Sequence, residues 1–304
     1  MTAVSTSAFY ERSTLNIAAL RTRAEALQGS LSSGERLNRS SDDPVAAARL
    51  RSLMRAESFS AIDLANANLA SADLQLADGA LSDFAAFTIR AQELATQAAS
   101  GTLSASQRAA IGQELGLIHT NLFALANARN VAGQALFGGE AAGAAYTLDA
   151  GGNAVYAGTA SAGELSLGEG LSVGRGLTGP EFLGFTHNGV PTDLLAVVKN
   201  LAAALQGGAA DPAQAARDAL GALDAGLDSV SAGQTLVGAR LAWIDLTTER
   251  RTDLSELRAS EQADLGGTDL AATISRLQEV MTVLEASQAS FARLASLSLF
   301  DVIR

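Results

Sequence analysis

The sequence predicts a mainly α-helical protein, a long antiparallel helical bundle or coiled coil built from both chain ends, with a small β-rich insert in the middle. Three observations predict this fold. Apolar residues recur at alternating spacings of three and four near both ends and in two segments between them. Short turns rich in Gly, Pro, Ser and Asp separate these segments. A Gly-rich stretch without helical period lies at the centre.

The first apolar seam lies in residues 13–32. Its members are Ile17, Leu20, Ala24, Leu27 and Leu31. Spacings of three and four place these side chains on one face of a helix, so the seam predicts a helix that packs against a partner helix.

Residues 31–50, LSSGERLNRSSDDPVAAARL, are predicted to be a joint between two helices. Gly34 and Asn38 are turn-forming residues that end the first helix. Asp42 and Asp43 offer capping oxygens and a charge that suits a helix N-terminus, and Pro44 fits the first helical position.

The helix that starts at Pro44 is predicted to run to about Ala99, a length typical of bundles and coiled coils. The sequence leaves open whether Asp78-Gly79 interrupts it. After a turn at 100–102, Thr102 or Ser104 caps the next helix. The seam of that helix contains Ile111, Leu115, Ile118, Leu122 and Leu125. A short turn between two long seams predicts an antiparallel helical hairpin.

From Gly133 the sequence becomes Gly-rich and loses its helical period. Tyr146–Leu148, Ala154–Tyr156 and Leu165–Leu167 are predicted strands, and residues 151–153 are the tip of a hairpin.

Helix is predicted to restart at Pro191-Thr192-Asp193, to break at Gly207-Gly208, and to start again at Asp211-Pro212. The strongest periodic signal follows, in Leu220, Leu223, Leu227, Val230, Gln234, Val237, Leu241 and Ile244. Gly266-Gly267 ends this helix, and Thr268 or Asp269 caps the last one. That helix carries Leu270, Ile274, Leu277, Met281, Leu284, Gln288, Phe291, Leu294 and Leu297.

The pattern is symmetric about the insert and predicts three domains. Residues 1–40 and 265–304 form a terminal domain of paired helices, residues 41–137 and 192–264 form an inner helical bundle, and residues 138–191 form a small outer insert. Each terminal seam buries too little to offset the entropy lost when its helix becomes ordered. The two ends are therefore expected to need each other and neighbouring subunits.

Composition excludes several functions. The net charge of −11 argues against nucleic-acid binding. The chain has no Cys, which excludes disulfides and cysteine nucleophiles. No apolar run approaches the roughly 18 residues of a membrane span. The N-terminus lacks the features of a cleaved signal peptide, so the protein is expected to be cytoplasmic or exported without cleavage.

Nothing in the sequence predicts an enzyme, a cofactor site or a metal site. The two histidines, His119 and His187, are far apart and form no metal-ligand spacing. His119 is interpreted as a packing residue and His187 as a turn residue. The stretch GEGLSVGRG, residues 168–176, resembles a phosphate loop weakly and is better explained by strand turns.

Four separated segments resemble the bacterial flagellin superfamily. They are LSSGERLNRSSDDPVAAA (31–48), NARNVAGQALFGG (127–139), VGARL (237–241) and MTVLEASQASFARLASLSLFDVIR (281–304). The last segment is most similar to the flagellar hook–filament junction proteins, where a Ser-Leu-Phe group closes the final helix.

The resemblance implies an extracellular structural subunit of the flagellum that joins hook to filament, is exported unfolded and polymerises through its terminal helices. It implies self-association in a ring or helix, contacts with a neighbouring hook-associated protein and with flagellin, and an export chaperone on the C-terminal helix. The expected assembly residues are Ile17, Leu20, Leu27, Leu31, Gly34, Arg36, Asn38, Asp42, Asp43, Pro44, Leu277, Met281, Leu284, Phe291, Leu294, Leu297, Leu299 and Phe300.

Two other functions remain open at the level of sequence. A filament flagellin with a minimal outer domain would share the resemblance, and a cytoplasmic coiled-coil scaffold would share the heptads. Arg36 and Asp43 are seven residues apart across the joint and are expected either to pair or to face a partner; an exposed pair contributes under about 1 kcal/mol.

Overall fold

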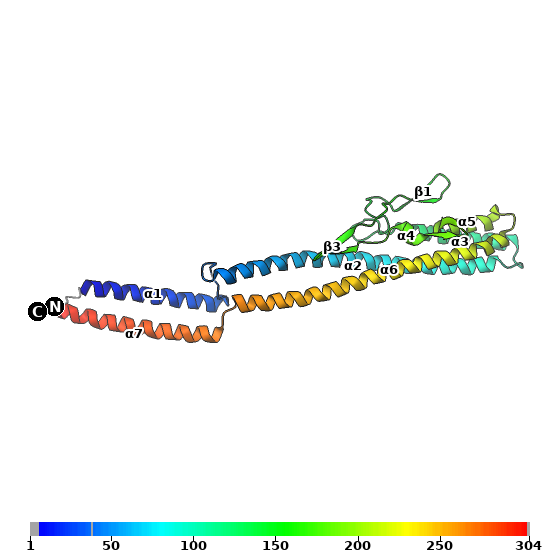
Figure 1. Ribbon diagram of the computed structural model, residues 1–304. Helices are drawn as coiled ribbons and strands as arrows, with labels where there is room; N and C mark the ends of the chain where they lie inside the picture. The colour runs from blue at the N-terminus through cyan, green and yellow to red at the C-terminus, as the bar shows by residue number, and fades with distance from the viewer. Residues whose placement is uncertain (1–5, 38, 303–304) are drawn as a thin grey trace. The chain divides into compact units, whose positions relative to one another are not determined.

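A computed structural model of the protein describes residues 6–37 and 39–302, with the side chains of residues 8–37 and 39–294. The described chain is mainly helical, as the sequence predicts (Figure 1). Its helices are α1 (Thr6–Ser33), α2 (Pro44–Ala98), α3 (Ala105–Ala126), α4 (Gly179–Leu183), α5 (Leu194–Ala203), the π-helical turn η1 (Ala204–Gly208), α6 (Pro212–Gly266) and α7 (Leu270–Val302). Its strands are β1 (Tyr146–Leu148), β2 (Ala154–Tyr156), β3 (Glu164–Gly168), β4 (Leu171–Gly174), β5 (Gly184–His187) and β6 (Val190–Asp193).

The chain divides into two compact units. Unit 1 takes the residues up to Ser58 and those from Asp253 onward, and unit 2 takes residues 59–252. The 55-residue helices α2 and α6 each contribute to both units. The two chain ends therefore meet in one unit, and the insert lies in the other.

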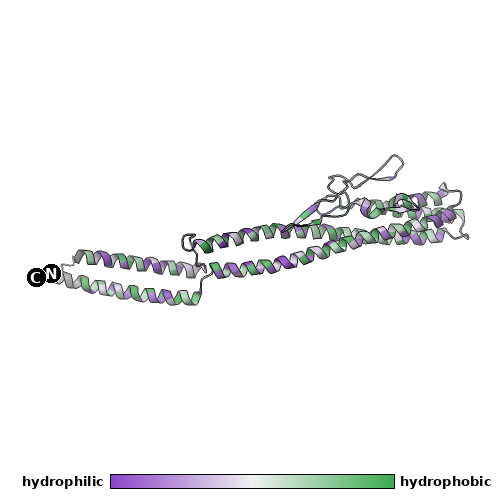
Figure 2. Ribbon diagram, viewed as in Figure 1, coloured by the Kyte–Doolittle hydropathy of each residue, from purple (hydrophilic) through white to green (hydrophobic). Residues whose placement is uncertain are grey.

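In unit 1, α1 and α7 lie side by side (Figure 1). Helix α1 starts at Thr6, earlier than the seam of residues 13–32 suggested. Figure 2 shows apolar and polar residues mixed along both helices.

Helix α2 passes through Asp78-Gly79 without a break, which settles the question that the sequence left open. The turn after α2 leads to Ser104, whose hydroxyl accepts a hydrogen bond from the Gln107 backbone N–H, while the Gln107 side chain accepts one from the Ser104 N–H. Ser104 is thus the cap of α3, in a reciprocal capping box.

The core of unit 2 is a cluster of aromatic rings surrounded by aliphatic side chains. Three phenylalanines are fully buried. They are Phe84 on α2, Phe137 in the segment between α3 and β1, and Phe182 on α4. Ring centroids lie 5.2 Å apart for Phe84 and Phe182 and 4.7 Å apart for Phe137 and Phe182. The cluster joins the helical bundle to the segments around the insert, and the predicted α3 seam packs in the same core through Leu115 and Leu122.

The described insert consists of three antiparallel hairpins, β1–β2, β3–β4 and β5–β6. The three predicted strands are confirmed as β1, β2 and the middle of β3. The stretch 168–176 holds the turn and second strand of the β3–β4 hairpin, as its interpretation as strand turns predicted.

The predicted restart of helix at Pro191 is wrong. Pro191 lies in β6, opposite Thr186 of β5. Asn188 and Gly189 have φ angles of 50° and 78°, which suit the two central residues of a type I′ hairpin turn. Helix begins only at Leu194, where the Asp193 carboxylate accepts a hydrogen bond of 2.8 Å from the Ala196 N–H. The sequence pattern missed this hairpin because each strand is only four residues long.

Two asparagines form hydrogen bonds at the point where the chain leaves α3 and enters the insert. The Asn127 side chain accepts a hydrogen bond from the Tyr146 N–H (2.9 Å) and donates one to the Tyr146 carbonyl (3.1 Å). The Asn130 amide donates to the buried Asp73 carboxylate at 3.1 and 3.2 Å. These contacts explain why NARN stands where helix gives way to strand.

Candidate assembly interface

The terminal helix pair of unit 1 is held by the seam that the sequence predicted on α1. In the seam of α1, Ala24 is 8% exposed and Ile17, Leu20, Leu27 and Leu31 are half-buried. At one end, the Tyr10 and Phe291 rings meet edge to face at 5.4 Å, and the Tyr10 hydroxyl donates to the Leu294 carbonyl.

On α7, the buried positions differ in part from the predicted seam. Thr273, Val280 and Leu284 are buried, and Leu277 and Phe291 are half-buried. Leu270, Ile274, Met281 and Leu294 are exposed by 42–53%. The helix therefore has two adjacent apolar rows, and the heptad pattern mixed them because Ile274 and Met281 directly follow the buried Thr273 and Val280 in sequence.

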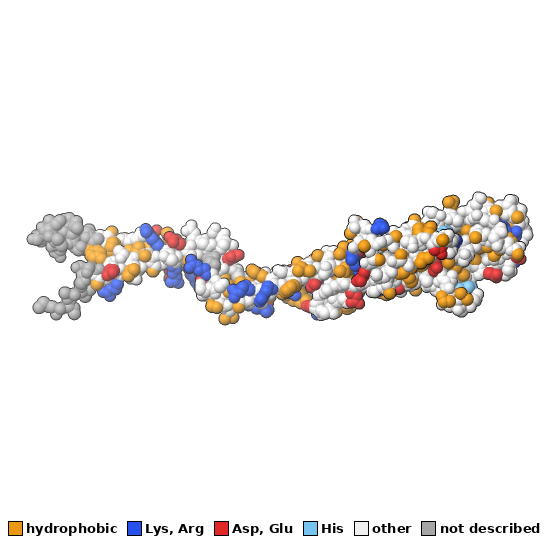
Figure 3. Space-filling view, turned by 90° about the horizontal axis from the view of Figure 1, so that it is seen from above, with side chains coloured by type: hydrophobic (Ala, Val, Ile, Leu, Met, Phe, Trp, Pro, Cys, Tyr) orange, Lys and Arg blue, Asp and Glu red, His pale blue; other side chains and the backbone are white. Residues whose placement is uncertain are grey.

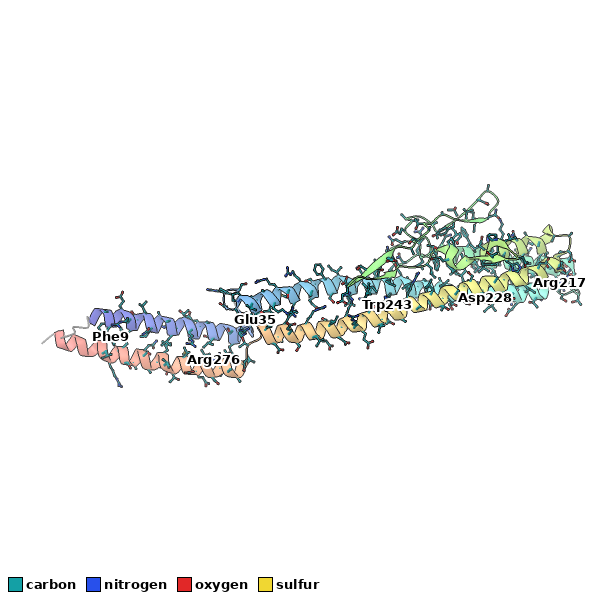
Figure 4. The ribbon with its side chains drawn as sticks, in the orientation of Figure 1. Phe9, Glu35, Arg217, Asp228, Trp243 and Arg276 are labelled. Carbon is teal, nitrogen blue, oxygen red and sulfur yellow. The ribbon has the colours of Figure 1, made fainter. Side chains whose placement is uncertain are left out.

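Exposed apolar side chains lie on both flanks of the buried seam of α7, where the chain itself leaves them uncovered. Leu270, Ile274 and Met281, four and seven residues apart, share one flank and are here called the outer row. Val283 and Leu294 lie on the other flank, because successive helical residues are turned by about 100°. A groove of about 360 Å³ lies on this second flank, with Phe9, Ile17, Val283 and Phe291 in its lining. Figure 3 shows apolar side chains at the surface of this pair, and Figure 4 labels Phe9. Contiguous exposed apolar surface of this kind is typical of interaction sites.

Some predicted assembly residues are not among the described ones. Asn38 lies outside the described residues, and the side chains of Leu297, Leu299 and Phe300 do as well. The backbone of residues 297–300 continues α7.

In the joint, the segment that follows α1 is hydrogen-bonded to the segment between α6 and α7. Glu35 and Gly267 form an antiparallel bridge, the Arg36 N–H donates to the Gly266 carbonyl (2.7 Å), and the Thr268 N–H donates to the Gly34 carbonyl (2.9 Å). Gly34 has a φ of +73°, the left-handed conformation that ends many helices and that favours glycine. The backbone at the end of α1 is thereby tied to the backbone between α6 and α7.

The Arg36 side chain contacts two other segments of the same chain at this joint. Its guanidinium donates to the Leu265 carbonyl at 2.7 Å, near the C-terminus of α6, where a cation is favourable. It also lies 3.7 Å from the Asp43 carboxylate. Of the two expectations, pairing is the one observed, and because both side chains are well exposed the pair itself contributes little.

The predicted start of α2 is confirmed, and the two aspartates accept hydrogen bonds from different segments. The Asp43 carboxylate accepts a hydrogen bond of 3.0 Å from the Ala46 N–H, and Pro44 is the first helical residue. The Asp42 carboxylate instead accepts one from the Arg39 N–H in the preceding turn (2.9 Å). Asp43 is therefore the cap and Asp42 stabilises the turn.

No pattern in the sequence indicates the ion pair between Arg49 on α2 and Glu261 on α6. The guanidinium forms two hydrogen bonds with the carboxylate, at 2.6 and 2.8 Å. This contact lowers the pKa of Glu261 and raises the pKa of Arg49. The residues are 212 positions apart, so only the fold brings them together.

The described residues contain no group of three or more His, Asp or Glu side chains able to hold a metal ion. Nor does any helix in the described part of the chain combine the length and hydropathy needed to cross a membrane. His119 and His187 lie in different elements, on α3 and at the end of β5.

The chain has similarity to known proteins over most of its length. The family model "Bacterial flagellin N-terminal helical region" matches residues 4–142. Flagellar hook-associated protein 3 of Escherichia coli (strain K12) is 26% identical over 288 residues, which cover 90% of each chain.

Solved structures show the same fold. A putative flagellar hook-associated protein from Vibrio parahaemolyticus matches with a TM-score of 0.67 and 21% identity, covering 74% of this chain and all of that one. The flagellar junction protein FlgL from Legionella pneumophila matches with a TM-score of 0.60 and 16% identity, covering 72% of this chain and all of that one.

Paired terminal helices with an insert in the middle of the chain are the architecture of the flagellar proteins that this chain resembles, and its residues 4–142 match the bacterial flagellin N-terminal helical region. By sequence and structure the chain is a homologue of flagellar hook-associated protein 3.

Proposed function

We propose that this protein is a structural subunit of the extracellular flagellum that joins hook to filament, and that it assembles through its terminal helices, with α1 and α7 of each copy packed against those of neighbouring copies. Its ring or helix would contact a hook-associated protein on one side and flagellin on the other. In this proposal, the terminal pair, the inner bundle and the insert serve as inner, middle and outer layers. Export in an unfolded state, without a cleaved signal peptide, precedes assembly.

The observation that carries this proposal is the outer row. One row of apolar residues already closes the α1–α7 pair, yet Leu270, Ile274 and Met281 remain 53%, 42% and 42% exposed beside it. A two-helix pair offers no third layer to cover them. Burying a Leu-sized side chain contributes about 1.5–3 kcal/mol, so a neighbouring copy that covers several of them stabilises itself and this pair together.

The exposed apolar residues of α7 also support a chaperone on this helix before export. Met281 lies on one flank of α7 and Val283 and Leu294 lie on the other, and exposed apolar surface promotes aggregation when it is left uncovered in a concentrated solution. We propose that the export chaperone binds this helix and is displaced when the protein polymerises.

The test is to place a charge in the outer row without disturbing the pair. Ile274→Glu and Met281→Glu change side chains that are exposed in the single copy, so we expect the isolated protein to keep its thermal midpoint. Incorporation into flagella, measured by immunoblotting of isolated filaments and hooks, should fall by tenfold or more. Ser275→Glu is the matched control because Ser275 is an exposed polar residue on the same helix that is not three or four residues from Ile274 or Met281 and so does not share their face.

Two results would contradict the proposal. Normal incorporation of Ile274→Glu and Met281→Glu would show that the terminal helices do not carry assembly. Immunogold labelling along whole filaments, instead of at one position next to the hook, would identify the protein as a filament subunit.

A further inference from the structure

The turn of the β5–β6 hairpin carries the only Asn of this chain that is followed by Gly. Asn188 and Gly189 are both exposed, and each has a positive φ. His187 and Val190 form the last pair of the ladder, so the backbone N–H of Gly189 lies outside it. The type I′ turn explains why this dipeptide stands here. The same two residues also form a reactive group.

The reactivity of the dipeptide comes from the Asn side chain. The backbone nitrogen of the next residue attacks the side-chain carbonyl carbon, displaces ammonia and closes a cyclic imide, the succinimide. A side chain on that next residue hinders the attack, and Gly has none. The attacking nitrogen must also lose its proton, which a hydrogen bond within a helix or a ladder opposes. Asn188 and Gly189 meet both conditions, and their exposure gives water access to them.

The His187 imidazole contacts the nitrogen that leaves in this reaction. Its Nε2 atom lies 2.9 Å from Nδ2 of Asn188. An imidazolium in this position can donate a proton to the departing nitrogen, and His is the side chain best suited to proton transfer near neutral pH. The ring packs against α6 at Gly221, where an added Cβ would lie 3.0 Å from its Cε1 atom. Close packing thus holds the imidazole beside the reacting amide.

Asn153, next to the tip of the β1–β2 hairpin, is exposed as well but lacks these features. It is followed by Ala154, whose side chain hinders attack on the amide. Its Nδ2 atom donates to the Asp149 carboxylate at 2.8 Å, and an ionised carboxylate has no proton to give to a leaving nitrogen. Asn153 is therefore the matched reference within the same chain.

We propose that Asn188 is a site of self-modification, at which the chain deamidates its own hairpin turn with water as the only co-reactant. The Gly189 nitrogen gives its proton to water and bonds to Cγ of Asn188. The Cγ–Nδ2 bond then breaks, and the departing nitrogen takes a proton from His187 and leaves as ammonia. His187 regains its proton from the solvent.

Water then opens the succinimide at one of its two C–N bonds. Opening at Cγ gives aspartate, which adds a negative charge beside His187 and keeps the turn, because Asp tolerates a positive φ as Asn does. Opening at the backbone carbonyl carbon gives isoaspartate, in which the backbone runs through the side chain. This adds one carbon to a two-residue turn, so His187 and Val190 lose the register in which they pair. The hairpin ends at Asp193, the cap of α5, so isoaspartate should also weaken the start of that helix.

The first test incubates the purified full-length protein at neutral pH, with its fold checked by circular dichroism, and follows its peptides by mass spectrometry. The peptide with Asn188 should deamidate at least about tenfold faster than the peptide with Asn153, because only Asn188 precedes a residue without a side chain. Electron-transfer fragmentation separates isoaspartate from aspartate in the product. Equal rates at the two residues, or no conversion at Asn188, would overturn the proposal.

Two substitutions test the roles of the neighbouring residues. Gly189→Asn keeps a residue that tolerates a positive φ and places a side chain beside the attacking nitrogen, so deamidation of Asn188 should slow by about tenfold. His187→Gln removes the proton donor and should slow it by about the same factor. The thermal midpoints of both variants should match that of the unaltered protein.

An unchanged rate in Gly189→Asn would overturn the succinimide route, and an unchanged rate in His187→Gln would overturn the role of the imidazole. The comparison of Asn188 with Asn153 uses the unaltered chain and so does not depend on how the variants fold. None of these measurements requires assembly, so their outcome is independent of the proposed function.

Discussion

Unit 1 and unit 2 are built from the same kinds of helix, yet they bury very different amounts of side chain. Unit 2 has a core of three fully buried phenylalanines within a large aliphatic cluster. In the described α1–α7 pair, Ala24, Thr273, Val280 and Leu284 are the buried residues. Two packed helices expose most of their surface, whereas helices covered by a further layer do not. The difference supports the proposal that unit 2 is stable by itself whereas the terminal pair is completed by neighbouring copies.

The largest effect that would test this contrast comes from truncating the core of unit 2. Phe182→Ala removes a ring that contacts both Phe84 and Phe137. We expect a loss of about 3–5 kcal/mol in the free energy of unfolding, measured by urea denaturation. Phe59→Ala is the control, because Phe59 is 67% exposed in the single copy. Equal losses for the two variants would remove the distinction between core and surface.

Amide exchange provides a direct comparison of the units. In the isolated protein, amides of α1 and α7 are expected to exchange at least about a hundredfold faster than those in α2 and α6 within unit 2, because few buried contacts oppose local opening. Hydrogen–deuterium exchange read out by mass spectrometry gives this ratio for each peptide. Similar protection in both units would contradict the view that the terminal pair depends on assembly.

Substitution of the capping residue at the joint should have a smaller effect on stability. Asp43→Ala removes the capping oxygen from the Ala46 N–H and should cost about 1 kcal/mol, seen as faster exchange at the start of α2 and a lower urea midpoint. Asp42→Ala is the matched control, since Asp42 bonds to the preceding turn. If the control destabilised the start of α2 as much as Asp43→Ala, the assignment of the cap would be wrong.

The smallest expected effect is a decrease in stability at acidic pH. His119 on α3 is half-buried, its Nε2 atom has no hydrogen-bond partner, and burial followed by the nearby Lys199 charge lowers its pKa. The unfolded chain, with a His pKa near 6.5, therefore takes up a proton before the folded chain does. The stability of unit 2 should therefore be constant above the pKa of the unfolded chain. It should decrease as the pH falls from that value toward the lower pKa of His119 in the folded chain.

Urea unfolding between pH 7.5 and 5.5 measures this dependence. His119→Leu should flatten it, and because His187 is present in both proteins its contribution cancels in the comparison. An unchanged slope in His119→Leu would exclude His119 as the cause.

The sequence alone predicted the long helices, the seams on α1 and α3, the cap at Asp43, the central insert and three of its strands. These features arise from local chemistry, namely the period of apolar residues, capping oxygens and turn-forming glycines, all of which lie close together in the chain. The resemblance of four segments also identified the family that the comparisons show.

Other features were decided only by tertiary structure. Which of two neighbouring apolar rows on α7 is buried depends on the angle at which α1 meets it, and periodicity cannot separate Val280 from Met281. The Arg49–Glu261 pair joins residues 212 positions apart. Each depends on contacts between distant segments, which a linear pattern does not contain.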